Sequence, residues 1–357
     1  MSDFHEVKIA EVYKETKDCS VVSFDIPGNL HDKFSYKQGQ YLTLRKELNG
    51  EEVRRSYSLC SSPLENKWQV AIKQIPGGIF STYANQELKH GDSIELMPPA
   101  GKFYVDVDEN KARNHIAFAA GSGITPILSI IKTHLIKEPQ STFKLFYLNR
   151  TVKSIIFKEE IERLKNQFFG RFQVFYFLTK EKRDIPFLNG RFDKEKLAVL
   201  TKSFIDVKDT SSCFLCGPQE MVFLIRDSLQ EAGLAKEKIH FELFFTGTNE
   251  ASEKQIAAAL EQKVEGTEVT IIDAGKEFHF VMDDDFDNIL DGALAAGADL
   301  PFACKGGVCS TCKCKIVEGS VEMKVNYALE EDEVAKNLVL SCQAVPTSNI
   351  VKVDFDV

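Results

Sequence analysis

The stretch CKGGVCSTCKCK, residues 304–315, places four cysteines within eleven positions. Cys304, Cys309 and Cys312 follow the spacing C-x4-C-x2-C, and Cys342 comes after 29 further residues. Three thiolates from one tight loop and a fourth from a distant segment are the ligand pattern of a plant-type [2Fe–2S] centre. Two adjacent glycines between the first two cysteines let the loop backbone bend around such a centre. The spacing therefore predicts that these four cysteines bind a [2Fe–2S] cluster.

A structural zinc site is the alternative for these cysteines. Zinc usually takes cysteines in C-x2–4-C pairs, whereas Cys342 stands alone in the sequence, which favours the iron–sulfur interpretation. Cys314, the last cysteine of the stretch, lies in the strand-like segment CKCKIVEG and is interpreted as a packing residue. Cys19, Cys60 and Cys213 show no partner pattern, so packing is the default for them too.

The size and composition of the chain predict several globular domains. A length of 357 residues exceeds one ordinary core, and 43% hydrophobic with 27% charged residues is usual for a soluble protein. No apolar run approaches the roughly 20 residues that span a bilayer, and the polar start MSDFHEVKIAEVYKET lacks the apolar region of a signal peptide. We therefore expect a cytoplasmic protein without membrane insertion, whose cysteines serve metal or redox chemistry before disulfides.

The charge is unevenly distributed along the chain. Residues 264–357 contain 18 Asp and Glu against 7 Lys and Arg, while the whole chain has a net charge of −9, so the preceding 263 residues carry a slight positive excess. This balance argues against nucleic-acid binding, which needs a basic surface. It is compatible with a basic protein partner, and equally with an acidic surface that aids solubility.

Two patterns of hydrophobicity divide the chain. Residues 1–107 contain short segments rich in Val, Ile, Tyr and Phe between Pro, Gly and Asn, which predicts an antiparallel β-barrel. Over 108–245, apolar strand-like runs alternate with helical segments, which predicts a doubly wound α/β domain. Residues 246–263 have the composition of a linker, and 264–357 return to short strands and turns. The helices expected in the first two domains span 81–89, 126–137, 157–167, 193–201 and 218–232.

A glycine-rich turn joins a buried strand to a helix in AAGSGITPILSII, residues 119–131. Such a turn lets dinucleotide phosphates approach the helix N-terminus, although Gly121 and Gly123 belong to G-x-G-x-x-P and not to G-x-G-x-x-G. Pro126 suits the first turn of a helix. Taken alone, the turn is equally compatible with a structural role. A second strand-to-helix turn, CGP at 216–218, strengthens the nucleotide-binding interpretation.

These turns, together with RRSYSLCSSP at 54–63 and GGIFSTY at 77–83, resemble the ferredoxin–NADP reductase family over about residues 5–245. The flavin motif R-x-Y-S of that family is matched by the first of these two stretches. Residues 264–357 resemble the plant-type ferredoxin domain, which implies an α+β β-grasp fold with a helix at 286–296. The order flavin barrel, nicotinamide domain, ferredoxin tail resembles the reductase subunits of multicomponent oxygenases.

The resemblance implies a set of catalytic and cofactor-binding residues. Arg55 would neutralise the flavin pyrophosphate, Tyr57 would pack on the isoalloxazine, and Ser58 would hydrogen-bond N5, the atom that receives hydride. Cys216 would lie beside the nicotinamide and Glu242 near the hydride path; a strand-end thiol and a surface acid are the alternatives. Ser58, Cys216 and Glu242 are thus the expected catalytic residues. The remaining expected cofactor-binding residues are Lys73, Gly78, Ser81, Gly121, Gly123, Thr125, Arg150, Lys180, Gly217, Pro218 and Phe244.

The identity of the nicotinamide donor depends on the residues near the adenosine ribose. An acid after the second strand binds the 2′-OH of NADH, whereas Arg or Lys accommodates the 2′-phosphate of NADPH. The segment YLNRTVKS, 147–154, offers Arg150 without an acid, and Lys180 lies in the loop after the next strand. This favours NADPH, with ordinary loop charges as the alternative.

The resemblance therefore implies an oxidoreductase that passes electrons from NADPH through FAD and a [2Fe–2S] cluster to the oxygenase component of a multicomponent, di-iron monooxygenase. FAD is favoured over FMN, which relatives with another domain order use. The alternatives are a reductase for another oxygenase or hydroxylase, a stand-alone NAD(P)H flavin or ferric reductase, and a non-enzymatic sensor or scaffold with a metal site.

Overall fold

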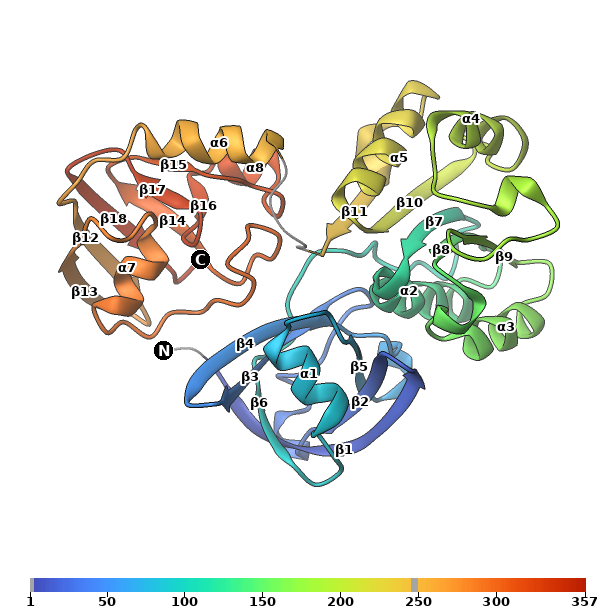
Figure 1. Ribbon diagram of the computed structural model, residues 1–357, viewed down its shortest axis with the longest axis horizontal. Coiled ribbons are helices and arrows are strands. Elements are labelled where there is room, and N and C mark those ends of the chain that lie inside the picture. The colour runs from blue at the N-terminus through green and yellow to red at the C-terminus, as the bar shows by residue number, and fades with distance from the viewer. Residues whose placement is uncertain (1–2, 245–249) are drawn as a thin grey trace. The chain divides into compact units, whose positions relative to one another are not determined.

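A computed structural model describes residues 3–244 and 250–357, and the chain divides into two compact units. The first comprises His5–Val53 and Tyr57–Phe244, and the second consists largely of the C-terminal segment (Figure 1). None of the helices within the described residues combines the length and the apolar composition needed to cross a membrane.

The first unit begins with a six-stranded sheet in the order β4-β3-β6-β1-β2-β5. Leu59, directly after β4, pairs with Val70 of β5, so the two edge strands meet and the sheet closes into the predicted barrel. Apolar side chains that point inward fill it, among them Val22, Leu42 and Ile72. Its elements are β1 (His5–Thr16), β2 (Cys19–Asp25), η1 (Gly28–Leu30), β3 (Tyr41–Leu48), β4 (Glu51–Ser58), η2 (Pro63–Glu65), β5 (Trp68–Lys73), α1 (Ile79–Gln86) and β6 (Ser93–Leu96).

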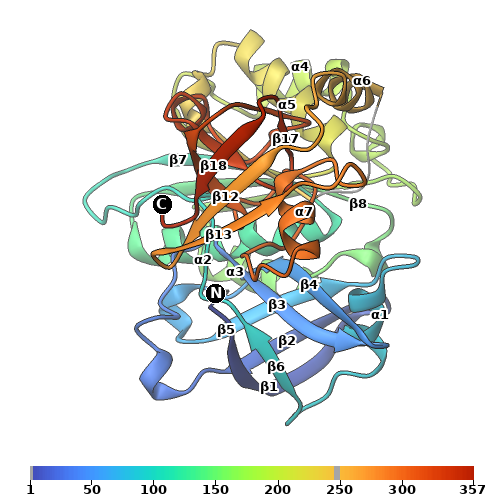
Figure 2. The ribbon, with the colours of Figure 1, turned by 90° about the vertical axis from the view of Figure 1, so that its left-hand side faces the viewer.

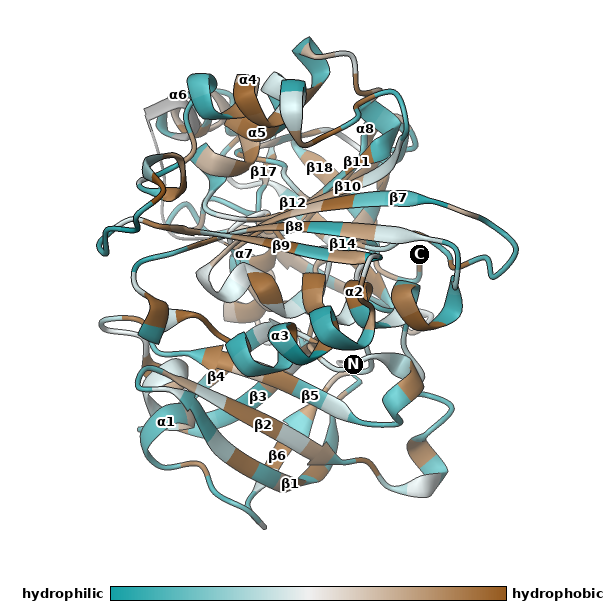
Figure 3. Ribbon diagram, turned by 90° about the vertical axis from the view of Figure 1, so that its right-hand side faces the viewer, coloured by the Kyte–Doolittle hydropathy of each residue, from teal (hydrophilic) through white to brown (hydrophobic). Residues whose placement is uncertain are grey.

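A five-stranded parallel sheet in the order β11-β10-β7-β8-β9 completes the first unit. The strand order reverses between β7 and β10, which is the switch point where doubly wound sheets bind their ligands. Helices α2 and α3 lie between this sheet and the barrel, and α4 and α5 cover its other face (Figure 3). The elements are β7 (Asn114–Ala120), η3 (Gly121–Gly123), α2 (Ile124–Lys137), β8 (Thr142–Asn149), η4 (Val152–Ser154), α3 (Lys158–Gln167), β9 (Phe172–Leu178), η5 (Pro186–Leu188), α4 (Lys194–Ser203), β10 (Thr210–Gly217), α5 (Gln219–Glu231), η6 (Lys236–Lys238) and β11 (Ile239–Leu243).

Helix α2 is buried from Ile124 to Leu135, including its polar side chains. Two of its hydroxyls bind the barrel segment that follows the flavin-motif strand β4. Ser129 Oγ donates to Ser61 O at 2.6 Å, and Thr133 Oγ1 lies 2.8 Å from Ser62 Oγ. Buried hydroxyls need such partners, because an unpaired one loses its bonds to water without compensation. These contacts fix the helix against the barrel.

Lys132, on the same face of α2, is only 4% exposed. Its Nζ lies 2.6 Å from Glu160 Oε1 of α3 and 3.1 Å from Glu65 Oε1 of η2. One buried cation therefore ties the sheet-covering helices to the barrel. Burying the ammonium is tolerated because two carboxylates compensate for the loss of hydration.

The second unit has the β-grasp arrangement expected of its sequence. Its five-stranded mixed sheet has the order β13-β12-β18-β14-β16, in which β12 and β18 are parallel, and a small sheet pairs β15 with β17. Helix α7 lies beside this sheet (Figure 2). The packing is close, since a Cβ on Gly292 would lie 3.2 Å from the Phe280 ring. The elements are α6 (Glu250–Leu260), β12 (Glu268–Asp273), β13 (Lys276–Val281), α7 (Ile289–Ala295), β14 (Lys313–Glu318), β15 (Val321–Met323), α8 (Glu331–Val334), β16 (Leu338–Leu340), β17 (Ala344–Pro346) and β18 (Ile350–Asp354).

The expected helices are present, and the largest differences lie at their ends. The helix predicted at 286–296 begins at Ile289, because the Asn288 side chain accepts a hydrogen bond from Asp291 N at 3.0 Å and caps it. Within the predicted linker, α6 forms a regular helix. The start of that linker, up to residue 249, lies outside the described residues.

Replacing Lys132 by Met tests how much its ion pairs with Glu160 and Glu65 contribute to stability. We expect the free energy of unfolding of the first unit to fall by about 3 kcal/mol, because two carboxylates lose their buried cation. The measurement is urea unfolding followed by the fluorescence of Trp68, the single tryptophan of the chain. Lys208→Met, at an exposed position, is the control and should change stability by less than about 0.5 kcal/mol. If the free energy of unfolding of Lys132→Met falls by less than about 1 kcal/mol, the stabilising role of Lys132 is contradicted.

Candidate functional site

Strand β4 carries the three residues of the predicted flavin motif. Arg55 is exposed, with its Nη1 2.7 Å from Arg54 O. Tyr57 is half-buried, and its ring centroid lies 5.7 Å from that of Phe80 in α1. Ser58, at the end of the strand, is 4% exposed. Because side chains alternate along a strand, Arg55 and Tyr57 project from one face and Ser58 from the other.

The turn into α1 is the predicted phosphate-binding turn of the barrel. Gly78 caps the helix, and a Cβ at this position would lie 2.5 Å from Ser81 Oγ. Ser81 Oγ accepts from Ile75 N at 3.2 Å and lies 3.3 Å from Gly78 O. The serine hydroxyl thus holds the turn itself, and the free backbone N–H groups of the first helical turn are the donors available to a phosphate.

Two turns meet at the switch point between β7 and β10. Gly121 has φ +54°, and a Cβ on Gly123 would lie 2.2 Å from Cys216 O, so no side chain fits between the η3 turn and the end of β10. Gly217 and Pro218 begin the turn into α5. The buried Thr125 donates from Oγ1 to Ser122 O at 3.0 Å and closes the turn into α2.

Tyr147 of β8 stabilises the turn at Gly121, because its hydroxyl donates a hydrogen bond to Gly121 O at 2.9 Å. The sequence did not single out this tyrosine. Lys73, at the end of β5, approaches the turn from the barrel: its Nζ lies 3.9 Å from the position of a Cβ on Gly121 and 3.7 Å from Asp18 Oδ2. The predicted flavin-side lysine thus lies beside the dinucleotide turn.

The three predicted catalytic residues come together at the ends of three strands. Cys216 of β10 is paired in register with Glu242 of β11, and Ser58 Oγ of the barrel donates to Glu242 Oε2 at 3.1 Å. Phe244, just after β11, is half-buried and packs against the apolar core to which Cys216 belongs. One hydrogen bond therefore joins the flavin-motif strand to the nicotinamide domain.

Burial controls the protonation of this group. It raises the pKa of Glu242 to about 7, against the opposing effect of the hydrogen bond from Ser58. Burial also raises the pKa of the Cys216 thiol well above its usual range, and the adjacent Glu242 adds to the shift. Cys216 is therefore a neutral thiol at physiological pH, while Glu242 exchanges a proton near neutrality.

The predicted ribose-binding cations lie at the ends of the next two parallel strands. Lys180 N donates to Arg150 O at 2.8 Å, so the two residues are neighbours after β9 and β8, and both are exposed. Glu181 lies beside them, and its Oε2 accepts from Val152 N at 2.9 Å. This acid was missed in the sequence because it lies 29 positions after Val152, the residue it binds.

The cysteines predicted to bind the cluster converge in the second unit. Cys309 Sγ lies 3.1 Å from Cys304 Sγ, and Gly306 N donates to Cys304 Sγ at 3.3 Å. Ser341 N donates to Cys312 O at 3.0 Å, which holds the segment of Cys342 against the cysteine loop.

The chemistry of this donor set fits a cluster ligated by thiolates. The hydrogen bond from the Cys309 thiol lowers the pKa of Cys304 to about 6, and the Cys312 thiol lowers that of Cys342. Donation to these sulfurs, together with burial, raises the pKa of Cys309 and Cys312 well above the usual range, so each pair shares one proton that metal binding would displace. Cys314 is fully buried in the apolar core of this unit, to which the predicted ligands Cys312 and Cys342 also belong, so its packing role stays a prediction.

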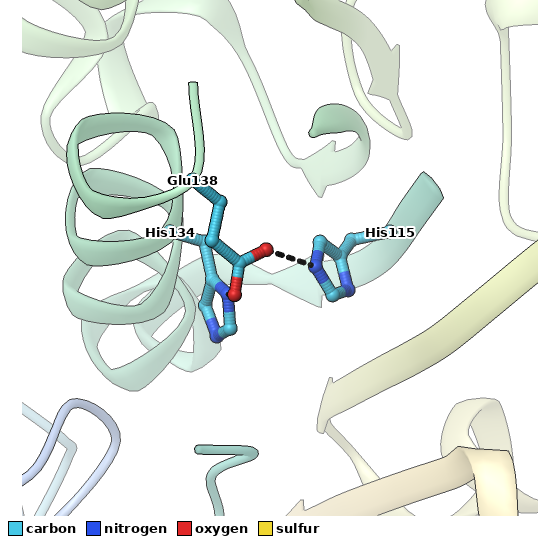
Figure 4. Close-up of side chains that lie close together, drawn as sticks. All are labelled: His115, His134 and Glu138. Carbon is cyan, nitrogen blue, oxygen red and sulfur yellow. Dashed lines mark hydrogen bonds and ion pairs between the residues drawn. The ribbon is translucent and has the colours of Figure 1, made fainter. Parts of the chain in front are cut away.

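A second cluster of potential metal ligands lies at the start of β7, the end of the strand away from the turn at Gly121 (Figure 4). Ligand atoms of His115, His134 and Glu138 lie within 4.8 Å of one another. However, Arg113 donates through Nε and Nη2 to the two Glu138 oxygens, and Ser141 Oγ donates to Oε2 at 2.7 Å. The guanidinium already neutralises the carboxylate, so we interpret the cluster as a structural ion-pair network.

Family models match three consecutive parts of the chain. An oxidoreductase FAD-binding domain matches residues 6–104, an oxidoreductase NAD-binding domain residues 118–227, and a 2Fe-2S iron-sulfur cluster binding domain residues 271–347. The fold and these matches define an electron-transfer oxidoreductase. The chain belongs to the ferredoxin–NADP reductase family, in the branch that carries a C-terminal plant-type ferredoxin domain.

Full-length relatives are components of oxygenases. The chain is 41% identical to one of the subunits of 1,2-phenylacetyl-CoA epoxidase of Escherichia coli K12, with 100% of this chain and 99% of that protein covered. It is 30% identical to the ferredoxin reductase component of 3-ketosteroid-9-alpha-monooxygenase of Rhodococcus rhodochrous, over 97% of this chain and 95% of that protein. Phthalate dioxygenase reductase shares the fold, with a TM-score of 0.59, 23% identity and coverage of 99% and 98%.

These findings confirm the predicted multidomain fold, the family, and the presence of FAD-, NAD- and [2Fe–2S]-binding domains. The zinc and non-enzymatic alternatives lose their support, because the cysteine stretch lies within the matched iron–sulfur domain. The roles of the individual residues and the domain boundaries stay predictions.

The buried histidines at the end of β7 predict a pH dependence of stability. Burial lowers the pKa of His115 to about 2 and that of His134 to about 4. Above pH ~6.5 both imidazoles are neutral in the folded and the unfolded chain, so they add no pH dependence. Below it the unfolded chain binds protons that the folded chain does not, so stability falls as the pH is lowered.

We expect each imidazole to contribute a slope of up to ~1.4 kcal/mol per pH unit between about pH 6.5 and 4.5. His115→Phe should make the measured fall shallower, because one titrating imidazole is removed. Urea unfolding at several pH values, followed by Trp68 fluorescence, provides the measurement. An identical slope in the variant and the parent would contradict the assignment.

Proposed function

We propose that this chain takes hydride from NADPH onto FAD and passes the electrons through its [2Fe–2S] cluster to the oxygenase component of a multicomponent monooxygenase. The observation that carries the proposal is the hydrogen bond from Ser58 to Glu242, because it joins the predicted flavin and nicotinamide residues at one switch point. Bound FAD accepts hydride as an electron pair, and the [2Fe–2S] cluster carries one electron at a time.

In this proposal residues of the barrel and of the parallel-sheet domain bind and orient the two cofactors. Arg55 pairs with the flavin pyrophosphate, Tyr57 packs against the flavin ring, and the Gly78 turn offers backbone donors to phosphate. The turns at Gly121, Gly123, Gly217 and Pro218 take the dinucleotide of the donor, with Thr125 holding the turn. Lys73 lies between the flavin-binding residues and the dinucleotide turn, and it adds positive charge there.

Ser58, Cys216 and Glu242 form the catalytic group of the proposal. The neutral Cys216 thiol offers an uncharged, buried wall for the nicotinamide, and Phe244 shields the flavin. Glu242, with its pKa near 7, holds or releases a proton at its carboxylate, and Ser58 is the hydroxyl through which that proton reaches the flavin site.

NADPH is the proposed donor because two exposed cations, Arg150 and Lys180, adjoin each other at the ends of β8 and β9. A 2′-phosphate carries negative charge that such cations bind, whereas the 2′-OH of NADH needs an acceptor. Glu181 lies beside these cations, but its Oε2 already accepts a hydrogen bond from Val152 N.

The proposed acceptor is an oxygenase of the phenylacetyl-CoA epoxidase kind. The relative with 41% identity over the full length is named as a subunit of that epoxidase, and the similarity extends through all three matched domains. Reductase components of other monooxygenases are more distant, at 26–32% identity.

An anaerobic titration with NADPH, and separately with NADH, tests the proposal. NADPH should bleach the flavin and cluster absorbance and produce the EPR signal of a reduced [2Fe–2S] centre. Extraction of the flavin should yield FAD. Recovery of FMN alone, or reduction by NADH at a far lower concentration than by NADPH, would contradict the respective assignment.

Loss of the cluster should separate the two halves of the electron path. Cys309→Ser removes one thiolate ligand, so we expect the cluster signal to be lost while NADPH still reduces the flavin at the normal rate. Turnover with the oxygenase component should fall at least about 100-fold, because the one-electron carrier is missing. The matched control is Cys314→Ser, at a buried cysteine of the same segment that is not a predicted ligand, which should retain the cluster signal. Full turnover of Cys309→Ser with the oxygenase would favour a stand-alone flavin reductase.

Removing the charge of Arg150, one of the two predicted ribose-binding cations, should change the KM values for NADPH and NADH differently. For Arg150→Ala we expect KM for NADPH to rise about tenfold, the loss of roughly 1.4 kcal/mol of charge-assisted binding, with little change in kcat. KM for NADH should stay within about twofold, because NADH lacks the 2′-phosphate. Steady-state kinetics with both donors give the comparison, and a parallel rise in both KM values would exclude a role in selecting the donor.

A further inference from the structure

Gln343 directly follows Cys342, the fourth predicted ligand, and is 5% exposed. Its side-chain Nε2 donates to Lys305 O at 2.9 Å and lies 3.4 Å from Cys342 Sγ. Lys305 lies in the loop that carries the other three cysteines. One side-chain amide thus contacts both chain segments that supply the ligands.

Several contacts constrain the cysteine loop beside Gln343. Lys305 is a non-glycine residue with φ +49°, a conformation that costs energy and persists only where its surroundings fix it. Gln343 fixes its carbonyl, and the ion pair between Lys305 Nζ and Asp291 Oδ1, at 2.6 Å, fixes its side chain. At Gly307, with φ +72°, a Cβ would lie 3.3 Å from Gln343 Cγ, so the glutamine fills the space beside the loop.

The side-chain amide also affects the charge on sulfur. Nε2–H points at a thiolate that would ligate iron, and a donor to a ligand sulfur withdraws negative charge from it. Such a donor stabilises the reduced centre, which carries one more negative charge, over the oxidised one. Hydrogen bonds to the sulfurs are among the determinants of the reduction potential of iron–sulfur centres.

We propose that Gln343 is a positioning residue for the iron–sulfur centre, which holds the cysteine loop at Lys305 and raises the reduction potential of the centre through Cys342. The inference rests on the proposed cluster site. It goes beyond that site because it assigns part of the redox tuning to a side chain that is not a ligand.

The first test is Gln343→Met, which keeps the length and bulk of the side chain but removes both N–H donors. We expect the reduction equilibrium of the centre to shift about threefold to tenfold toward the oxidised form, which is ~28–59 mV for a one-electron couple. The potential is measured by redox titration of the full-length chain with EPR detection. The matched control, Gln262→Met, lies at an exposed glutamine of the same unit and should leave the potential unchanged.

A merely structural role would give a different result. In that case the potential of the assembled centres in Gln343→Met would stay that of the parent, and this outcome would overturn the proposal whatever the variant does to cluster content or thermal stability. Gln343→Glu, which keeps the shape and presents acceptors in place of donors, should lower the potential at least as far as Met.

The unsubstituted protein offers a test that does not depend on how the variants assemble. With ¹⁵N in the side-chain amides of glutamine, pulsed EPR of the reduced protein should detect one ¹⁵N nucleus magnetically coupled to the centre. Its absence would overturn the role of Gln343. Absence of any [2Fe–2S] signal would overturn the proposed function and this inference together, so the two failures are distinguishable.

Discussion

Helix α2 has almost no side that faces solvent, and this constraint determines how the first unit is built. Because the helix is buried between the parallel sheet and the barrel, each polar side chain on it must find a partner within the protein. Ser129, Lys132 and Thr133 find theirs in the segment just after the flavin-motif strand. The same helix begins at the dinucleotide turn, so its fixed position also sets the distance between the two predicted cofactor sites.

Local patterns in the sequence predicted the parts of the structure that depend on local chemistry. The C-x4-C-x2-C spacing located the iron–sulfur loop, and the alternation of apolar runs with helices located the parallel sheet to within a few residues. The glycine turn at 121–123 was identified from its G-x-G-x-x-P pattern as a phosphate-binding turn. The structure adds a packing reason for Gly123, because a Cβ there would lie 2.2 Å from Cys216 O. The resemblance to a known family supplied Ser58 and Glu242, which no spacing connects.

The features that escaped prediction depend on pairs distant in the sequence. Glu181 binds a backbone amide of another loop, Tyr147 supports the dinucleotide turn from the neighbouring strand, and Lys132 has one partner in each of two other elements. Each of these side chains is ordinary in its local sequence. Only the folded chain brings such partners together, and burial then makes each contact energetically necessary.

The barrel and the nicotinamide domain share one apolar core: Val21, Ala71 and Phe103 of the barrel half pack in the same cluster as Ile127 and Ile130 of α2. A protein engineer who wished to exchange parts between reductases of this family would therefore find that the flavin and nicotinamide halves transplant only together. A chimera joined near residue 107 would mismatch two faces of a close-packed interior. A junction after residue 244 would leave that interior whole, so new electron acceptors are most simply reached by exchanging the iron–sulfur half.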